Sequence, residues 1–475
     1  MKTKVKRIYI PVEIMDREID GACLLALEAI KKGWEVIIGS QPIIMKNIES
    51  SKKGIYFLKS ITPGQIDIQK RIINAGSYVV CQDQEGLLQR PGMSYKIRFS
   101  RESLSLAKKV FFWGELQKKE FIDALGEDHS ADLVISGSPR ADHWELISQK
   151  LNKTGKNLGK GKCILIATSF GKENHALGKA GHYNLLKDVA GIKYGANDSK
   201  SFHNHFQSLL DLGNFVLPYY KKLVIELAKS LPEEKIIVRP HPSENIEMWK
   251  ELTKEFGNIE VNNKGTIIEW IMRSKLLIQY ASSSAIQANI LGTPVFSLIP
   301  DLPDNLKSLD LLHSKEVSTI FRNVDDLIDG CKNLCSTPNY YETKQHEFLD
   351  QIIFSRRTVD SAKRIIKELD KLFSQLQFTS NNNYGPFLRY KFSRFKYKIT
   401  LILSLIPFWE KIVPQKYKHV SLFTYMYYKT RKQPSFTLDE FKDKINEIKS
   451  LSNNKIKIKI QKIKKNVFKL KQINS

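Results

Sequence analysis

Two polar turns that each follow a short apolar run constrain this chain more than any other feature of its sequence. KIIV (235–238) has β-strand character and stops at the turn RPHP (239–242). KLLIQY (275–280) stops at Ser282 to Ser284, and AIQANIL (285–291) then has helical spacing. Strand, polar loop and helix in succession predict an α/β sheet. In such sheets ligands bind beyond the carboxyl ends of the strands, where both turns should lie.

The two turns offer hydrogen-bond donors that suit a phosphate. Ser282, Ser283 and Ser284 supply hydroxyls at a helix start, where free N–H groups and the helix dipole attract anions. Arg239 and His241 supply further donors. Taken alone, each turn has an ordinary alternative, an N-cap for the serines and a rigid surface turn for the histidine. Two such turns, each after a strand, favour a phosphate site.

The amino-terminal residues predict a βαβ unit. RIYIPVEI (Arg7 to Ile14) is expected to be a strand, Arg17 to Gly33 an amphipathic helix, and Trp34 to Ser40 a second strand. This is a Rossmann-like opening, but no GxGxxG follows the first strand, so no bound dinucleotide is indicated. The charged segment Glu13 to Glu18, which includes Arg17, follows that strand. It is a candidate to line a cleft, and an ordinary capped helix start is an equal alternative.

A pair of carboxylates follows a later strand. SYVVCQ (Ser77 to Gln82) leads into Asp83, Gln84, Glu85 and Gly86. A carboxylate at the end of a buried strand can act as a general base on a sugar hydroxyl, with its pKa set by burial and neighbouring charges. An ordinary acidic loop explains the same residues equally well.

The domain boundary is expected in the Gly-, Lys- and Asn-rich stretch Lys150 to Lys162. CILIATSF (163–170) restarts the strand pattern and runs into a polar loop that carries Asn174 and His175. We therefore predict an amino-terminal domain at 1–150, a linker at 151–162, and a second Rossmann-like domain at 163–380. Its closing helices are expected at 320–334 and 340–377, the second able to cross back onto the first domain.

Charge is concentrated in the carboxyl-terminal extension, 381–475. The 475 residues carry a net charge of +25, and positions 381 to 475 hold 22 Lys+Arg and 5 Asp+Glu, a net +17. The excess therefore says little about the substrate of the core. Five scattered cysteines are typical of a reducing compartment. Neither a signal peptide nor an apolar run long enough to span a bilayer is recognised, so we expect a cytoplasmic protein.

The extension has the composition of a membrane-surface segment. Phe387 to His419 interleaves basic and aromatic residues around the apolar run Ile399 to Trp409, which suits a helix in the membrane interface. Lys455 to Lys471 has only basic charged residues, which anionic lipid attracts. We predict a basic helical extension, peripheral at the inner face of the plasma membrane. A solvated extension is the second alternative, and nucleic-acid binding, which we do not expect, a distant third.

The order and spacing of these motifs resemble the bacterial surface carbohydrate biosynthesis proteins. These are relatives of the two-domain GT-B glycosyltransferases that include sialyltransferases and Kdo transferases. The resemblance covers about Arg7 to Leu369 and leaves out the extension. It is carried by PVEIMDREIDGACLLA, DQEG, FFWGELQ, SGSPRAD, ILIATSFGKENH, VRPHPSE and ASSSAIQANILGTPV.

The resemblance implies roles for particular residues. A His-Pro motif and a Ser/Thr motif hold the donor phosphate, often that of a CMP-sugar, and here they correspond to His241-Pro242 and the serines at 282–284. An acidic-acidic-Gly motif supplies the catalytic carboxylate, which maps to Glu85, with Asp83 as second choice. Gln84 replaces the first acid of that motif. Gln287 stands where many relatives carry a ribose-binding Glu, and its amide still bonds hydroxyls.

We therefore predict an α/β, GT-B-like fold in which two Rossmann-like domains face a central cleft, and a glycosyltransferase acting on a surface polysaccharide or lipid-linked acceptor. The donor is expected to be a nucleotide-sugar, with a CMP-sugar favoured, and neither a metal nor a cofactor is expected. A CDP-glycerol or other polyol-phosphate transferase of the teichoic type is one alternative. A non-catalytic nucleotide-sugar-binding partner subunit is the other. Glu85 acting as a base would give inversion, and as a nucleophile retention.

Overall fold

The computed structural model describes most of the chain in well-defined segments. These are residues 5–87, 99–127, 129–153, 161–178, 183, 198–309, 313–336, 345–378 and 436–473, with a few single residues between 388 and 402. Parts of the predicted linker (154–160) and nearly all of the predicted interfacial segment 387–419 lie outside the described residues.

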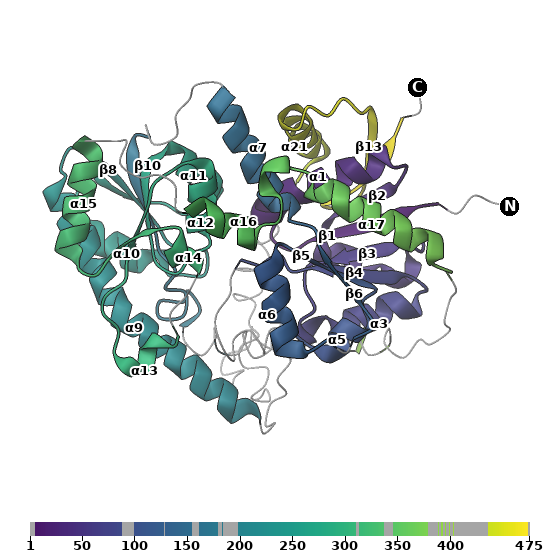
Figure 1. Cartoon of the computed structure of the whole chain (residues 1–475), viewed down its shortest axis with the longest axis horizontal. Helices are drawn as coiled ribbons and strands as arrows, with labels where there is room; N and C mark the ends of the chain where they lie inside the picture. The colour runs from purple at the N-terminus through teal and green to yellow at the C-terminus, as the bar shows by residue number, and fades with distance from the viewer. Residues whose placement is uncertain are drawn as a thin grey trace.

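Two sheets dominate the molecule: strands from the first 135 residues and a carboxyl-terminal hairpin form one, and strands between 163 and 321 form the other (Figure 1). The first has the order β13-β14-β2-β1-β3-β4-β5-β6, and the second β12-β11-β10-β7-β8-β9. All pairings in the second sheet are parallel, and so are those from β2 to β6 in the first. The predicted α/β fold class with two Rossmann-like domains is confirmed.

Elements of the first domain alternate between strand and helix. Its strands are β1 Arg7–Val12, β2 Glu35–Ser40, β3 Ile55–Leu58, β4 Tyr78–Gln82, β5 Lys109–Phe112 and β6 Asp132–Ile135. Its helices are α1 Met15–Lys31, α2 Gln41–Lys46, α3 Ile66–Asn74, α5 Arg101–Ser105, α6 Glu115–Leu125 and α7 Pro139–Lys153, with 3-10 turns η1 Ile48–Ser50 and η2 Pro63–Gln65.

Elements of the second domain also alternate between strand and helix. Its strands are β7 Cys163–Ala167, β8 Lys235–Arg239, β9 Ile259–Val261, β10 Ser274–Gln279, β11 Val295–Leu298 and β12 Thr319–Phe321. Its helices are α9 Asp198–Ser230, α10 Ile246–Thr253, α11 Ile267–Arg273, α12 Ser284–Leu291, α13 Asp304–Lys307, α14 His313–Glu316 and α15 Val324–Ser336. The helix predicted at 320–334 begins too early, because its first residues pair with β11 as strand β12.

Strand β1 shows why the apolar runs form central strands. Every residue of RIYIPV is buried, and β1 pairs in parallel with both β2 and β3. Ile8, Ile10 and Val12 face the cluster under α1, whereas Tyr9 faces the opposite layer. A parallel strand covered on both faces reads as a continuous apolar run, because neither face meets water. Helix α1 then carries Asp16 and Glu18 in its first turn and Lys31 in its last, which complements the helix dipole.

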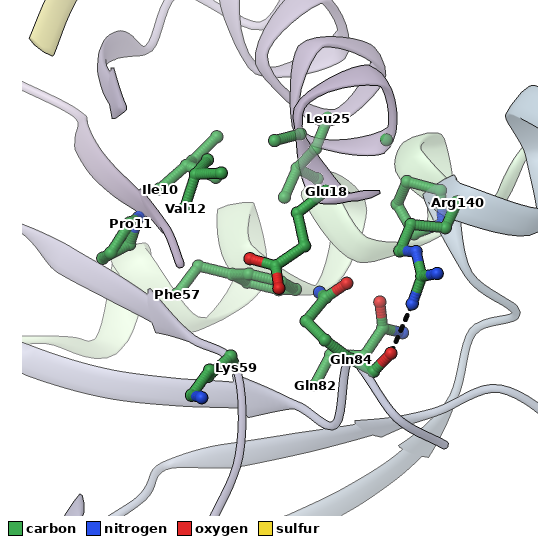
Figure 2. A pocket seen from close by; sticks show the side chains of 13 residues that line it. Ile10, Pro11, Val12, Glu18, Leu25, Phe57, Lys59, Gln82, Gln84 and Arg140 are labelled. Carbon is green, nitrogen blue, oxygen red and sulfur yellow. Dashed lines mark hydrogen bonds between the residues drawn. The ribbon is translucent and has the colours of Figure 1, made fainter. Parts of the chain in front are cut away.

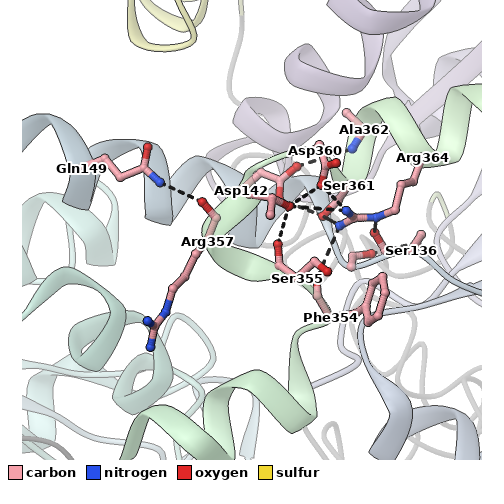
Figure 3. A network of polar contacts seen from close by, with 12 residues as sticks. Ser136, Asp142, Gln149, Phe354, Ser355, Arg357, Asp360, Ser361, Ala362 and Arg364 are labelled. Carbon is pink, nitrogen blue, oxygen red and sulfur yellow. Dashed lines mark hydrogen bonds and ion pairs between the residues drawn. The ribbon is translucent and has the colours of Figure 1, made fainter.

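The closing helices connect the two domains. After α16 Gln345–Ile352 and the turn η3 Arg356–Thr358, helix α17 Ser361–Gln375 packs in the core of the first domain, as the sequence analysis allowed. The carboxylate of Asp142 on α7 holds the start of α17: it accepts from Ser361 Oγ at 2.7 Å and from Ala362 N at 3.4 Å (Figure 3). Acceptors at a helix start satisfy N–H groups that lack intrahelical partners.

One apolar cluster spans both halves of the chain. It joins Trp113 and Trp144 of the first domain to Leu165 and Ile286 of the second and to Ile352 of α16. Helix α7, which carries Trp144, packs on α1 and also on α12. The candidate loops of the two domains are therefore held against each other by a shared hydrophobic core, although the exact domain limits stay a prediction.

The described end of the extension belongs to the first domain. Helix α21 Leu438–Leu451 is followed by a hairpin, β13 Ile458–Lys464 and β14 Val467–Gln472, and β14 pairs antiparallel with β2. The expected extension thus contains a helix, and the run 455–471 forms an edge of the first sheet, while its predicted contact with a membrane stays a prediction. Along β13 the isoleucines at 458 and 460 are half-buried and alternate with exposed residues. Within the described segments, no helix combines the length and apolar character that a membrane crossing requires.

Candidate active site

The predicted site residues follow strands at the carboxyl ends of the two sheets. Asp83 and Glu85 follow β4, the His241 turn follows β8, and the serine turn follows β10. Strand β7 lies between β8 and β10, so the histidine and serine turns are separated by two strand spacings, about 10 Å. The loop after β7 lies between them and carries Asn174 and His175.

The two carboxylates of the first domain have different surroundings. Asp83 is buried, and its Oδ1 accepts from the backbone N of Glu85 at 3.0 Å. Trp113 Nε1 donates to the carbonyl of Asp83 at 2.7 Å. Asp83 therefore shapes the turn. The Glu85 side chain keeps 33% of its surface exposed, which makes it the better placed of the two to meet a substrate.

Arg17 joins α1 to this turn. Its Nη1 lies 3.1 Å from Glu85 Oε1 and its Nη2 lies 2.8 Å from Glu18 Oε1. Burial lowers the pKa of Arg17, but the charges of Glu18 and Glu85 outweigh burial and the pKa is raised. The segment after β1 thus contributes a cation that holds Glu85 in place.

Sequence reasoning missed Arg140, at the start of α7. Its guanidinium lies over the rings of Trp113 and Trp144, 5.6 and 5.5 Å from their centroids, and donates to the carbonyl of Gln84. Burial, followed by the charge of Arg17, lowers the pKa of Arg140 to about 9. Figure 2 shows it in a pocket beside Glu18 and Gln84. The motif SGSPRAD was the available signal, since an Arg directly after a strand and turn stands at the ligand edge.

His241, in the turn after β8, is a residue of the second domain whose pKa depends on charges of the first domain. Desolvation lowers the pKa of its ring to about 4. Among neighbouring charges Arg17 lowers this pKa and Glu85 raises it. His241 Nδ1 accepts from the backbone N of Ser243 at 3.2 Å and lies 2.7 Å from Ser243 Oγ. The ring is therefore neutral at pH 7, with Nε2–H as its free donor.

Glu244, also missed from the sequence, organises the histidine turn. Its Oε1 accepts from Thr168 Oγ1 at 2.8 Å, from Phe170 N at 3.1 Å and from His241 N at 3.0 Å. Its Oε2 accepts from Trp249 Nε1 at 2.9 Å. One buried carboxylate thus ties the loops after β7 and β8 together. Four donors explain how a carboxyl group is accommodated in the core.

Asn174 and His175, in the loop after β7, contact the histidine turn and hold it in place. Asn174 Nδ2 donates to the carbonyl of Asn245 at 2.9 Å, and His175 pairs with Glu244 through an isolated β-bridge. His175 Nδ1 accepts from Leu177 N at 3.0 Å. Burial lowers the pKa of His175 to about 4. Their proposed contact with substrate stays a prediction, and the contacts described here position the loop.

The serine turn has the strained backbone typical of a binding loop. Ala281 has a φ of 53°, in the left-handed region that non-glycine residues rarely adopt. Ser282 N donates to Gln279 Oε1 at 2.8 Å, and Ser284 Oγ donates to Ser282 Oγ at 2.9 Å. Ser283 caps α12 without a side-chain hydrogen bond, so the N-cap explanation of this hydroxyl does not hold.

Gln287 and Arg239 lie on either side of these turns. Gln287 is buried on α12, and its Oε1 has no hydrogen-bond partner within the described residues. Arg239 donates to the carbonyls of Lys264 and Gly265 at 2.8 and 2.6 Å, so the loop before α11 already uses its guanidinium. Burial lowers the pKa of Arg239 to about 10, against the opposing charges of Glu269 and Asp16. A role for Arg239 in binding phosphate stays a prediction.

No protein-family model matches the sequence, and no curated protein matches it significantly. Solved structures are similar in fold. One, from Listeria monocytogenes, is described as a UDP-N-acetylglucosamine 2-epimerase (15% identity, TM-score 0.47, 80% of this chain and all of the other covered). The wall teichoic acid polymerase TagF gives 14% identity and a TM-score of 0.45, with 78% and 90% covered. MnaA of S. aureus bound to UDP gives 11% and 0.47, with 80% and 100% covered. Likeness at this level identifies no substrate.

Proposed function

We propose that this chain is a glycosyltransferase that moves a sugar from a nucleotide-sugar, with a CMP-sugar favoured, onto a surface polysaccharide or lipid-linked glycan. One observation carries the proposal: Glu85 and His241 follow strands β4 and β8 at the carboxyl ends of the two sheets, and a shared apolar cluster packs these two halves together. A donor group and a carboxylate that face each other from two domains suit a group-transfer reaction between two bound substrates.

In the proposed mechanism the second domain holds the donor phosphate. The Nε2–H of neutral His241 and the hydroxyls of Ser282 and Ser283 would donate to phosphate oxygens. As the bond to the sugar breaks, negative charge grows on the leaving nucleotide. Donors already aimed at that position stabilise the transition state more than the ground state, which is where catalysis gains most. Gln287, with its unpaired Oε1, would accept from a hydroxyl of the nucleotide ribose.

The first domain would supply the acceptor side. Glu85 would take the proton of the attacking acceptor hydroxyl, a contribution typically worth about 10²- to 10⁴-fold in rate. Arg17 holds the carboxylate toward the gap at 3.1 Å, and the buried Asp83 keeps the turn in shape.

The first test is a thermal-shift screen with CMP, CDP, UDP and GDP compounds, since a ligand that binds only the native state raises its melting temperature. The donors that bind are then assayed for turnover, with CDP-glycerol included. Turnover of CDP-glycerol and of no sugar nucleotide would replace the proposal with a polyol-phosphate transferase. Nucleotide binding without turnover of any donor would indicate a partner subunit.

Two variants then separate binding from chemistry. Glu85→Gln should keep the nucleotide-induced thermal shift and lose about 100-fold or more in kcat. His241→Ala should weaken the thermal shift itself. Glu28→Gln, on α1 and paired with Lys31, is the matched control and should change neither. Full turnover by Glu85→Gln would remove that carboxylate from the mechanism.

A further inference from the structure

A second pocket lies at the other end of the first sheet. It opens between the sheet, α2 and the hairpin β13–β14, and its volume is about 210 Å³. Arg7 and Glu35, which line it, are the first residues of β1 and β2. The candidate active site lies at the carboxyl ends of these strands, so this pocket is separate from it.

The lining of this pocket is apolar, with cations around the mouth. Tyr9, Ile37, Ile44, Val467 and Ile463 supply the apolar wall, and Ile463 on the hairpin is 42% exposed. A mostly apolar wall with a few polar groups is typical of pockets that bind small molecules. An exposed isoleucine beside an open apolar pocket is unfavourable in water, which suggests that a ligand or surface covers both.

Charge at the mouth selects the kind of ligand. Four cationic side chains line the pocket (Arg7, Lys52, Lys464 and Lys469) against the single carboxylate of Glu35. Lys469 and Arg7 already pair with Glu35, at 2.9 and 2.5 Å. Lys52 and Lys464 are exposed, and Lys464 Nζ donates to Asn47 Oδ1 at the same mouth. Because that amide is neutral, neither lysine has its charge balanced there, and both can meet an anion.

The hairpin extends this charge along the edge of the sheet. Lys457, Lys459, Lys462 and Lys464 are exposed along and just before β13, the edge strand labelled beside α21 in Figure 1. Lysines on an edge strand also protect it from pairing with another chain. That protection explains the lysines, but it does not explain a large apolar pocket opening beside them.

Five apolar residues described singly before the hairpin are exposed. Leu388, Phe392, Phe395, Ile399 and Ile402 are each between 40% and 65% exposed. In the sequence these positions lie alternately four and three residues apart, which is the period of an amphipathic helix. An apolar helical face together with a basic surface is the pattern of segments that lie in a membrane interface.

We propose that the pocket and the lysine-bearing edge of the hairpin bind an anionic phospholipid of a bilayer. Its acyl chain would enter the apolar pocket past Ile463, and its phosphate would meet Lys52 and Lys464. This places the amino ends of the first sheet toward the membrane. The inference does not depend on the transferase proposal, because it uses no residue of the candidate active site.

Vesicle flotation of the full chain tests the charged edge. Wild type should bind vesicles of phosphatidylcholine with an equal share of phosphatidylglycerol, and not phosphatidylcholine alone. Lys459→Glu with Lys462→Glu and Lys464→Glu should weaken binding roughly 100-fold. The matched control, Lys229→Glu with Lys250→Glu and Lys254→Glu on exposed helices of the second domain, makes the same change in net charge and should bind within about threefold of wild type. Equal loss in both variants would overturn the hairpin assignment.

A soluble short-chain phosphatidylglycerol tests the pocket itself. It should raise the melting temperature of wild type and of Ile463→Leu, and not of Ile463→Glu, which places a charge at the mouth. Glycerol phosphate at the same concentration should give no shift. An equal shift with glycerol phosphate would mean a free-phosphate site, and binding of a DNA oligonucleotide without vesicle binding would mean a nucleic-acid surface. Either result contradicts the proposal. An unchanged nucleotide-induced shift in all variants keeps this result separate from the transferase test.

Discussion

At the residue scale, His175 shows how burial and one hydrogen bond set a protonation state. The side chain is 6% exposed, and its Nδ1 accepts from the backbone N of Leu177. An accepting nitrogen must be unprotonated, so the hydrogen bond and the low pKa of about 4 describe the same neutral ring. His241, held in the same way by Ser243 N, should likewise enter the reaction neutral.

The neutral state of the His175 ring makes the free energy of unfolding depend on pH. In the unfolded chain a histidine has a pKa of about 6.5, so between pH 6.5 and 4 the unfolded state binds more protons than the native state. The free energy of unfolding should therefore fall as pH falls through that window, with His175 contributing on the order of 2–3 kcal/mol. His175→Asn keeps an acceptor and removes the titration. Urea midpoints at pH 7 and pH 5 should differ less in this variant than in wild type, and an equal difference would contradict the assignment.

At the element scale, the start of α17 depends on a side chain from another helix. Asp142 on α7 accepts from Ser361 Oγ and Ala362 N, and burial raises its pKa to about 7. Gly137, with a φ of +75°, brings the strand end close to Ser361: an added Cβ would lie 2.4 Å from Ser361 Oγ. Helix α17 therefore returns to the first domain at a point built by the SGSPRAD turn.

Substitution of Asp142 tests this contact. Asp142→Ala should cost about 2–3 kcal/mol in the free energy of unfolding, because it leaves the donors at the helix start unpaired. Asp142→Asn keeps an acceptor and should cost less than about 1 kcal/mol at pH 8. The native pKa of Asp142 lies above the unfolded value, so wild type binds more protons when folded and loses stability as pH rises from about 4 to 7. The Asp142→Asn variant should lose less free energy of unfolding than wild type as pH rises from about 4 to 7. Lys153→Ala is the surface control.

At the scale of the whole molecule, the end of the chain completes the first domain. Phe441 of α21 and Phe468 of β14 stack at 4.0 Å, and both are fully buried with Ile445, Ile448 and Leu470 in the cluster under α1. Lys444 of α21 also lies 3.0 Å from Asp20 of α1. Deleting 381–475 would therefore remove part of a core as well as a basic surface, so truncation is a poor test of membrane binding.

Truncation tests the core instead. A chain that ends at 435 should aggregate or melt at least about 10 °C lower than wild type, because burial on the first sheet is lost. Phe468→Ala should by itself cost about 3–5 kcal/mol, whereas Lys442→Ala, on the exposed face of α21, should stay within about 0.5 kcal/mol. A truncated chain that melts with the wild type would show that α21 and the hairpin contribute nothing to the domain.

The order of strands, turns and helices was readable from the sequence, because the hydrophobic period and the turn residues are local. That order predicts that Glu85, His241 and the serine turn stand at carboxyl ends of strands. The roles of Glu244 and Arg140 were not readable. Glu244 satisfies donors from residues 168 to 249, and Arg140 lies between two tryptophans from different elements. Neither arrangement produces a periodic pattern in the sequence.

The sequence by itself determined two Rossmann-like halves and the strand ends at which their polar residues gather. Only the tertiary structure decided that Arg17 pairs with Glu85, and that a lysine-rich tail forms the edge of a sheet. The physical reason is range. Backbone geometry couples residues a few positions apart, whereas packing couples β14 to β2 across more than four hundred residues, and no local pattern records which distant surface will cover an apolar face.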